Sequence, residues 1–382
     1  MLPIQTYSRY FDFHPAPEAG GVSPATHGIF PVWGFGTVLN STHPKIFVGE
    51  RVYGYLAPTR YLLLPVSPAD VNKHAFYVPR PHLPPGMSLF LDQSKAANLF
   101  QDRRPYNQIL RCAADPQYTP TPAAEDLTML YRPLFWTSYW CEDWLFLSNY
   151  RGGASVILLS SASSKTAFCL AYLIRKRIDR GEVGPNVKVV GLTSKGNLEF
   201  TRGLGLYHDV LEYGSFTLSP MFQIASAEKR WIYVDLASNK SLNRRIFNHF
   251  ASSKAGTLLA RIALGVTTVA PTSSNASTLD WSPNTFTTTN NTASPQVENF
   301  FMVEWLNVRR HQLSPSEIFG RQDRAWKNFM QDCTSWVKID HVCGGDAVKQ
   351  AYEAVAKNGL GPEKGLIWSL WNKDEKYVAS KL

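Results

Sequence analysis

Cysteine is scarce in this sequence, and long apolar runs are absent. The five cysteines lie far apart and no two of them form a C-x-x-C pair, which argues against both a disulfide framework and a structural zinc site. No stretch approaches the roughly 18 consecutive apolar residues of a transmembrane helix, and residues 1–6 lack the basic start and apolar core of a secretory signal. These absences predict a cytoplasmic protein with no membrane partner.

Motifs of zinc-dependent and hydrolytic catalysis are missing as well. His27 and His43 have no neighbouring cysteine, so the Cys/His/carboxylate set of a catalytic zinc is not visible and a metal-free site is the better interpretation. No G-x-S-x-G string occurs, which argues against the nucleophile elbow of the α/β-hydrolases.

The charge is positive overall but dispersed. The chain of 382 residues has a formal net charge of +9. Its densest basic cluster, residues 175–180, falls at the end of a predicted helix, where cations complement the helix dipole. This pattern does not favour nucleic acid as a partner, whereas a basic surface suits an anionic cofactor or substrate.

Three regions follow one another along the chain. Residues 28–92 contain short runs of valine and aromatic residues broken by glycine and proline, a pattern typical of a small, irregular β-barrel or sandwich. Residues 123–150 are dense in Leu, Phe and Trp and are predicted to be helical. Residues 154–269 alternate between strand and helix patterns, which predicts a parallel sheet covered on both faces.

Strands and helices are predicted throughout the alternating region and beyond it. The predicted strands are 156–159, 187–192, 209–212, 231–236 and 264–269, and the predicted helices are 166–180, 197–204, 242–250 and 256–261. Residues 271–295 are dominated by Thr, Ser and Asn and are expected to form a mobile surface insertion. Beyond residue 300 we expect helices at 315–334 and 345–358 and a strand at 365–370.

Several strings resemble the medium-chain dehydrogenase/reductase superfamily. Residues 31–38, PVWGFGTV, are similar to its glycine-rich barrel strand, and residues 48–54, VGERVYG, to its G-D-R-V turn. Residues 345–355 followed by 365–368 resemble its closing helix and returning strand. The closest similarity is to an uncharacterised branch, domain of unknown function 2855, through residues 31–35, 49–55, 131–138, 160–167 and 191–197.

The resemblance implies an α/β fold in which a small irregular β-barrel (GroES-like) domain accompanies a doubly wound, Rossmann-type parallel sheet. It implies a barrel domain at 1–150, a nucleotide-binding domain at 151–299 that includes the insertion at 270–299, and a return to the first domain at 300–382. A homodimer through an edge strand is a further implication. The branch usually begins with a strand that reaches the active site; no counterpart is visible before His27, so no catalytic residue is carried over from it.

The first turn of the alternating region is a candidate phosphate site. A strand-to-helix turn presents backbone N–H groups at the positive end of a helix, which binds an anion whatever its side chains are. Here the turn carries serines and a lysine where a dinucleotide fold usually carries G-x-G-x-x-G. Alternatively, the serines only cap the helix and Lys165 points to solvent. The candidate cofactor-binding residues are Ser160, Ser161, Ala162, Ser163, Ser164, Lys165 and Thr166.

The ends of later strands supply further candidates. The second strand ends in Thr193, Ser194 and Lys195, with no acid before Glu199. An acid at this place binds the ribose hydroxyls of NAD, while hydroxyl and positive groups suit the extra phosphate of NADP, so the pattern favours NADP. An exposed polar turn with Asn197 as a helix cap is the alternative. Asp235 and Gly265 end later strands and are expected at the cleft, unless Asp235 caps the following helix.

Two tyrosines are candidate proton donors. Hydride transfer without zinc needs an acid to protonate the developing enolate or alkoxide, and Tyr55 and Tyr139 lie in strings expected to border the cleft, although each could simply pack. Arg132, Thr137 and Ser138 are candidate contacts for the substrate.

These features predict an NADPH-dependent, zinc-independent reductase that acts on an activated C=C or C=O of a small molecule. The missing glycines and the missing first strand favour one alternative, a redox-neutral enzyme such as a lyase, hydrolase or isomerase. A non-catalytic nucleotide-sensing protein is a further alternative. The sequence does not identify the substrate.

Overall fold

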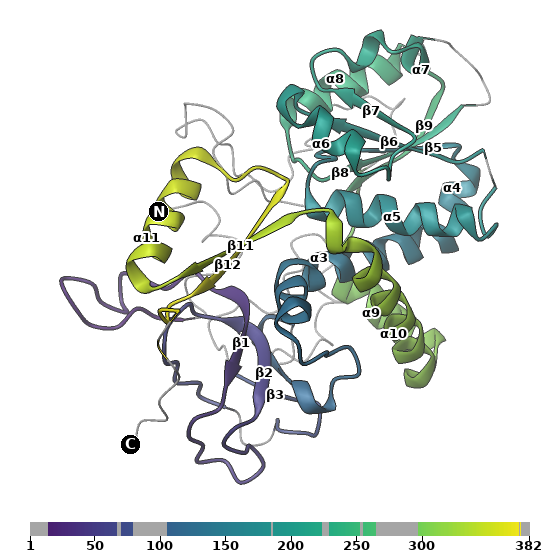
Figure 1. The fold of residues 1–382 in the computed structure, drawn as a ribbon. Coiled ribbons are helices and arrows are strands. Elements are labelled where there is room, and N and C mark those ends of the chain that lie inside the picture. The colour runs from purple at the N-terminus through teal and green to yellow at the C-terminus, as the bar shows by residue number, and fades with distance from the viewer. Residues whose placement is uncertain are drawn as a thin grey trace.

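The chain folds into an antiparallel β sheet and a larger parallel sheet that are joined by long helices (Figure 1). The computed structural model describes residues 14–66, 70–78, 105–184, 186–223, 229–252, 255–264, 297–373 and 375. Within these ranges there are also two strands near the C-terminus that form a sheet of their own.

The antiparallel sheet is built on alternation between large and small residues. Glycines 34 and 54 separate aromatic residues along two paired strands, so the aromatic rings lie on one face of the sheet. The other face packs on a small core that includes Val52, Leu56 and Ile109. In sheet order the strands are β1 (Val32–Thr37), β2 (Arg51–Leu56), β4 (Gln108–Arg111) and β3 (Ala75–Tyr77).

The parallel sheet has the strand order β10-β9-β8-β5-β6-β7. Read from the β7 edge, its strands occur along the chain as third, second, first, fourth, fifth and sixth, which is the order of a Rossmann-type sheet. The predicted α/β fold with a doubly wound sheet is therefore confirmed. The strands are β5 (Val156–Leu159), β6 (Lys188–Thr193), β7 (Asp209–Glu212), β8 (Arg230–Asp235), β9 (Thr257–Ala263) and β10 (Val297–Asn299).

Helices cover the parallel sheet, and some of them lie between it and the antiparallel sheet. The long helix α3 (Pro122–Leu147) starts at Thr121, whose side chain accepts a hydrogen bond from the Ala124 amide, and it packs along α5 (Lys165–Asp179). Figure 1 shows α9 and α10 beside α3. The remaining helices are α4 (Asn149–Gly153), α6 (Leu198–Gly203), α7 (Pro220–Gln223), α8 (Lys240–Ala251), α9 (Met302–Gln312) and α10 (Pro315–Asp332).

A β-α-β unit ends the described chain. It consists of β11 (Lys338–Cys343), α11 (Gly345–Asn358) and β12 (Lys364–Ser369), and its two strands are parallel. A Cβ at Gly365 would lie 2.8 Å from a methyl carbon of Leu130. This glycine therefore allows β12 to lie close to α3, between the two larger sheets.

Two predictions for the parallel sheet are wrong. Residues 257–261 of the predicted helix 256–261 lie in strand β9, because a short apolar run is compatible with either element and a neighbouring strand decides between them. Residues 297–299, predicted as part of the insertion, form the edge strand β10. The rest of that insertion, and residues 265–269 of the predicted strand 264–269, lie outside the described residues.

Candidate functional site

A cavity of about 2670 Å³ lies between the two larger sheets. On one side it is lined by β1, β2, β3 and α3, and on another by α9 and β12. Residues at the ends of four parallel strands, or within two residues of them, also line it; they are Ser161 after β5, Leu236 after β8, Ala263 in β9 and Asn299 in β10. Ligands of doubly wound sheets bind at this carboxyl edge, so the cavity is the candidate functional site.

The turn after β5 combines a left-handed residue with a capped helix start. Ser161 has a φ of 51°, in the left-handed region that usually requires glycine. Ser164 is the N-cap of α5, and its hydroxyl accepts a hydrogen bond from the Ala167 amide at 3.3 Å. The amides of Lys165 and Thr166 then open the helix, where no carbonyl of the preceding turn can reach them. These two N–H groups are available to an anion at the positive helix end.

Two tyrosines and one glycine hold this turn. The Tyr207 hydroxyl donates to the Ala162 carbonyl at 2.7 Å, and the Ser161 amide donates to the Tyr213 hydroxyl at 2.9 Å. A Cβ at Gly191 would lie 2.7 Å from the Cβ of Ala162, so only glycine lets the turn pack so closely on β6. Burial raises the pKa of Tyr213 to about 12, which keeps its hydroxyl protonated. Tyr207, Tyr213 and Gly191 were not among the predicted site residues.

Ser160 and Asp235 form a buried network at the ends of β5 and β8. Both side chains are fully buried, and the Ser160 hydroxyl donates to Asp235 at 2.9 Å. Asp235 also accepts hydrogen bonds from the Asn243 amide at 2.8 Å and from backbone amides that follow it. Burial raises the pKa of Asp235, and these hydrogen bonds oppose the rise. Helix α8 is capped by Asn239 rather than by Asp235, so this carboxylate holds neighbouring turns together.

The end of β6 divides into buried and exposed groups. The Thr193 hydroxyl is buried and donates to the Ser163 hydroxyl at 3.2 Å, which also accepts a hydrogen bond from Asn197 at 3.0 Å. Ser194 and Lys195 are exposed. Thr193, Ser163 and Asn197 thus brace the two turns against each other, while Ser194 and Lys195 are accessible to a ligand.

Lys165 links the turn to the C-terminal unit instead of pointing to solvent. Its ammonium group donates to the Lys364 carbonyl of β12 at 2.9 Å, and burial lowers its pKa. Ser138 is similarly engaged, because its fully buried hydroxyl lies 2.8 Å from the Thr166 carbonyl. The structure does not bring Ser138 to the cavity, since it faces α5.

The other predicted residues of α3 and β2 separate into two groups. Arg132, Thr137 and Tyr55 line the cavity. Arg132 is paired with Asp115 at 2.6 Å and with Gln117 at 3.0 Å, so its charge is balanced. Tyr139 is absent from the cavity wall because it lies on another face of α3, where its ring packs on those of Phe135, Trp136 and Trp140. Gly265 lies outside the described residues.

Glu304 at the start of α9 was missed by the sequence reasoning. It lines the cavity, and burial raises its pKa, so its carboxyl group holds a proton to a higher pH than an exposed glutamate does. No motif surrounds it in the sequence. An acidic residue in the first turn of a helix is the one feature that marks it in the sequence.

No three His, Cys, Asp or Glu side chains among the described residues come together as a metal site. None of the helices in these ranges is both long and apolar enough to span a membrane.

Comparison with known proteins gives one family match and several similar folds. The model of a family described as "Protein of unknown function (DUF2855)" matches residues 4–361. No curated protein matches the sequence. The structure is similar to the yhdH oxidoreductase from Salmonella enterica in complex with NADP, with 13% identity, 89% of this chain and 82% of that chain covered, and a TM-score of 0.42. It is also similar to CurA from Vibrio vulnificus, with 10% identity, 97% and 86% coverage, and a TM-score of 0.45.

Proposed function

The chain belongs to this family of proteins of unknown function, and from its strand order and cavity we propose that it is an NADPH-dependent, zinc-independent reductase of an activated C=C or C=O in a small molecule. We also propose the division of the chain into a substrate domain at 1–150, a nucleotide-binding domain at 151–299 and a return segment at 300–382.

One observation carries the proposal. Four strand ends of a Rossmann-ordered sheet open into a cavity whose opposite wall belongs to another sheet. A cofactor at the carboxyl edge would therefore meet a substrate held by the antiparallel sheet. NADPH would supply a hydride there. The residues of the chain would bind and orient the substrate and protonate the enolate or alkoxide that develops from it.

The residues of the turn fit a pyrophosphate through their backbone rather than their side chains. The Lys165 and Thr166 amides lie at the positive end of α5, and the Tyr213 hydroxyl, which accepts a hydrogen bond from the Ser161 amide, holds the turn in place. Ser194 and Lys195, both exposed, would hold the 2′-phosphate that distinguishes NADPH from NADH.

Proton transfer can be assigned to two candidates on the cavity wall. Tyr55 lines the cavity, and Glu304 adds a carboxyl group whose pKa is raised by burial. A raised carboxyl pKa brings an acid closer to the pH at which a reductase works, so Glu304 is the better proton donor.

The test is a fluorescence titration with NADPH and NADH. We expect NADPH to bind more tightly, and Lys195→Glu to weaken NADPH binding by about tenfold or more, since a charge-assisted contact contributes about 1.5–3 kcal/mol, with little effect on NADH. Lys188→Glu is the matched control, because it makes the same charge change at the opposite, exposed end of β6. Binding of neither nucleotide would contradict the reductase.

The hydrogen bonds of the turn support a second candidate. The Ser160 and Ser163 hydroxyls and the Ser161 amide all have partners within the protein, as expected if the turn had lost a cofactor and the scaffold served a redox-neutral enzyme. A non-catalytic nucleotide sensor would instead bind NADPH without turning over any enone.

A further inference from the structure

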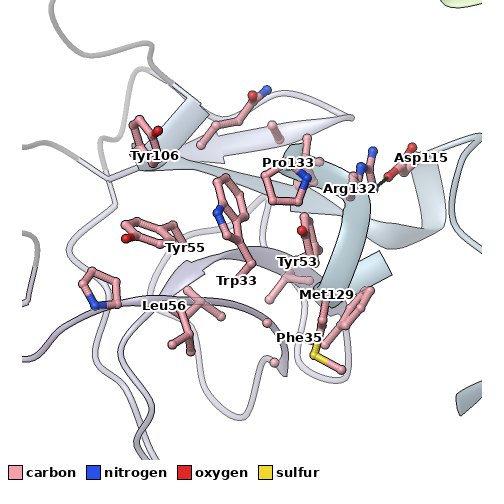
Figure 2. Close-up of a pocket in the computed structure, with 18 of the residues that line it drawn as sticks. Trp33, Phe35, Tyr53, Tyr55, Leu56, Tyr106, Asp115, Met129, Arg132 and Pro133 are labelled. Atoms are coloured by element: carbon pink, nitrogen blue, oxygen red, sulfur yellow. Dashed lines mark hydrogen bonds and ion pairs between the residues drawn. The ribbon is translucent and has the colours of Figure 1, made fainter. Parts of the chain in front are cut away.

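An aromatic wall forms the part of the cavity that belongs to the antiparallel sheet. We define it as Trp33, Phe35, Tyr53, Tyr55 and Tyr106, and Figure 2 shows these side chains together opposite Met129 and Pro133 of α3. Trp33 pairs with Tyr55 and Phe35 with Tyr53 across β1 and β2. The four rings therefore share one face of the sheet, while the intervening residues face the small core.

Trp33 is the centre of this wall. Its ring stacks on Tyr53 at 5.6 Å with an interplanar angle of 21°, and it lies 5.2 Å from the ring of Tyr55 and 6.0 Å from that of Tyr106. Phe35 extends the wall at 4.9 Å from Tyr53. Aromatic rings at these separations offer both faces and edges to a further flat ring.

Two buried polar groups on the cavity wall have no partner among the described residues. They are the hydroxyl of Tyr53, whose side chain is 2% exposed, and the indole N–H of Trp368 on β12. A buried donor without a partner is costly, and an indole N–H can only donate. Burial also raises the pKa of Tyr53 far above its usual value, so its hydroxyl stays a donor. Both groups indicate a ligand that carries hydrogen-bond acceptors.

The charges next to the wall are balanced. Arg132 lies 5.3 Å above the Tyr53 ring but is paired with Asp115, and Arg51, above Phe35, is paired with Glu125. A charged ligand would lose its hydration beside this wall without gaining an unpaired counter-ion. The surface therefore favours an uncharged molecule.

We propose that the aromatic wall binds a flat, uncharged carbonyl compound whose carbonyl is conjugated to an aryl ring, with the Tyr53 hydroxyl donating to the carbonyl oxygen. As the substrate class of a reductase this inference rests on the proposed function; as a binding site it does not. Tyr53 is then a specificity-determining residue rather than the acid, because its raised pKa opposes loss of its proton.

The test measures binding to the full-length protein without nucleotide, by calorimetry. The probe is 4-phenyl-3-buten-2-one, and the matched ligand is 4-cyclohexyl-3-buten-2-one, which has the same enone on a non-aromatic ring. We expect the aryl enone to bind about three- to tenfold more tightly, as an aromatic contact allows. Equal affinities for the two ligands would overturn the assignment of an aryl compound.

Substitutions distinguish the contribution of the aromatic rings to binding from that of the Tyr53 hydroxyl. We expect Tyr53→Phe to weaken aryl-enone binding by about three- to tenfold without lowering the melting temperature, since it removes only an unpaired buried hydroxyl. Tyr352→Phe, at an exposed tyrosine of α11, is the control. Trp33→Leu should reduce the preference for the aryl ligand, and Trp33→Phe should retain most of it.

Unchanged affinity in Tyr53→Phe would overturn the role of the hydroxyl. Because no nucleotide is present, a protein that binds the aryl enone but not NADPH would refute the reductase and keep the aryl site, and the reverse result would refute the aryl site alone.

Discussion

Replacing Gly191 by alanine tests how the turn after β5 is held. The new Cβ would lie 2.7 Å from the Cβ of Ala162 and 3.0 and 3.1 Å from two ring carbons of Tyr207. The Ala162 Cβ cannot rotate away, so the backbone of the turn or of β6 must move. Overpacking costs about 1–3 kcal/mol, and loss of the hydrogen bond from Tyr207 to the Ala162 carbonyl would add about 1 kcal/mol.

We therefore expect Gly191→Ala to lower the free energy of unfolding by about 2–4 kcal/mol. For a domain of this size each kcal/mol corresponds to about 2–4 °C in melting temperature, which circular dichroism resolves readily. Nucleotide affinity should fall as well, because the displaced turn carries the amides of the proposed phosphate site.

Two further variants make this prediction specific. Gly196→Ala is the control, since a Cβ there would meet nothing within 4 Å, and its stability should match that of the unchanged protein. Ala162→Gly in the Gly191→Ala background removes the opposing Cβ and should restore part of the loss. A melting temperature of Gly191→Ala equal to that of Gly196→Ala would show that the turn is not held by this contact.

Two other changes test the cavity wall. If Glu304 is the proton donor, kcat/KM should fall as the pH rises through its raised pKa, because the carboxyl group then loses its proton. Glu304→Gln should lower the rate about 100-fold or more and remove this pH dependence. An unchanged pH profile in this variant would point to Tyr55 as the donor instead. Arg132→Met should lower the free energy of unfolding by about 3–5 kcal/mol in urea titrations, because it leaves the buried Asp115 carboxylate unpaired. Adding Asp115→Asn to this variant should recover part of the loss. A change below about 1 kcal/mol for Arg132→Met would show that solvent screens the ion pair.

The alternation of strands and helices could be predicted because each element carries its own signal. Strand β5 is a continuous apolar run, and α5 begins at a serine cap and ends in basic residues, so both were predicted nearly to the residue. Strand β9 was not, because Thr257–Ala263 is compatible with a helix until β8 pairs with it.

The candidate site was predictable only in part. Its two turns follow from strand ends, but the hydroxyls of Ser160 and Ser163 prove to be engaged by Asp235, Thr193 and Asn197. Partners so distant in sequence leave no local pattern. Tyr139 and Ser138 illustrate the same limit, because a helix offers several faces and only its neighbours decide which one meets the cavity.

The sequence by itself determined the class of fold, since propensity, apolar runs and turn residues act over a few neighbouring positions. It also determined that the first turn carries serines and a lysine where such folds usually carry glycines. The tertiary structure decided what those groups do: Lys165 bonds to β12, and Tyr207 and Tyr213 hold the turn. It also decided which rings form the aromatic wall, because pairing between β1 and β2 brings together residues that lie some twenty positions apart. Burial and hydrogen bonding depend on groups remote in the chain, and for that reason the chemistry of the site followed from the fold and not from its motif.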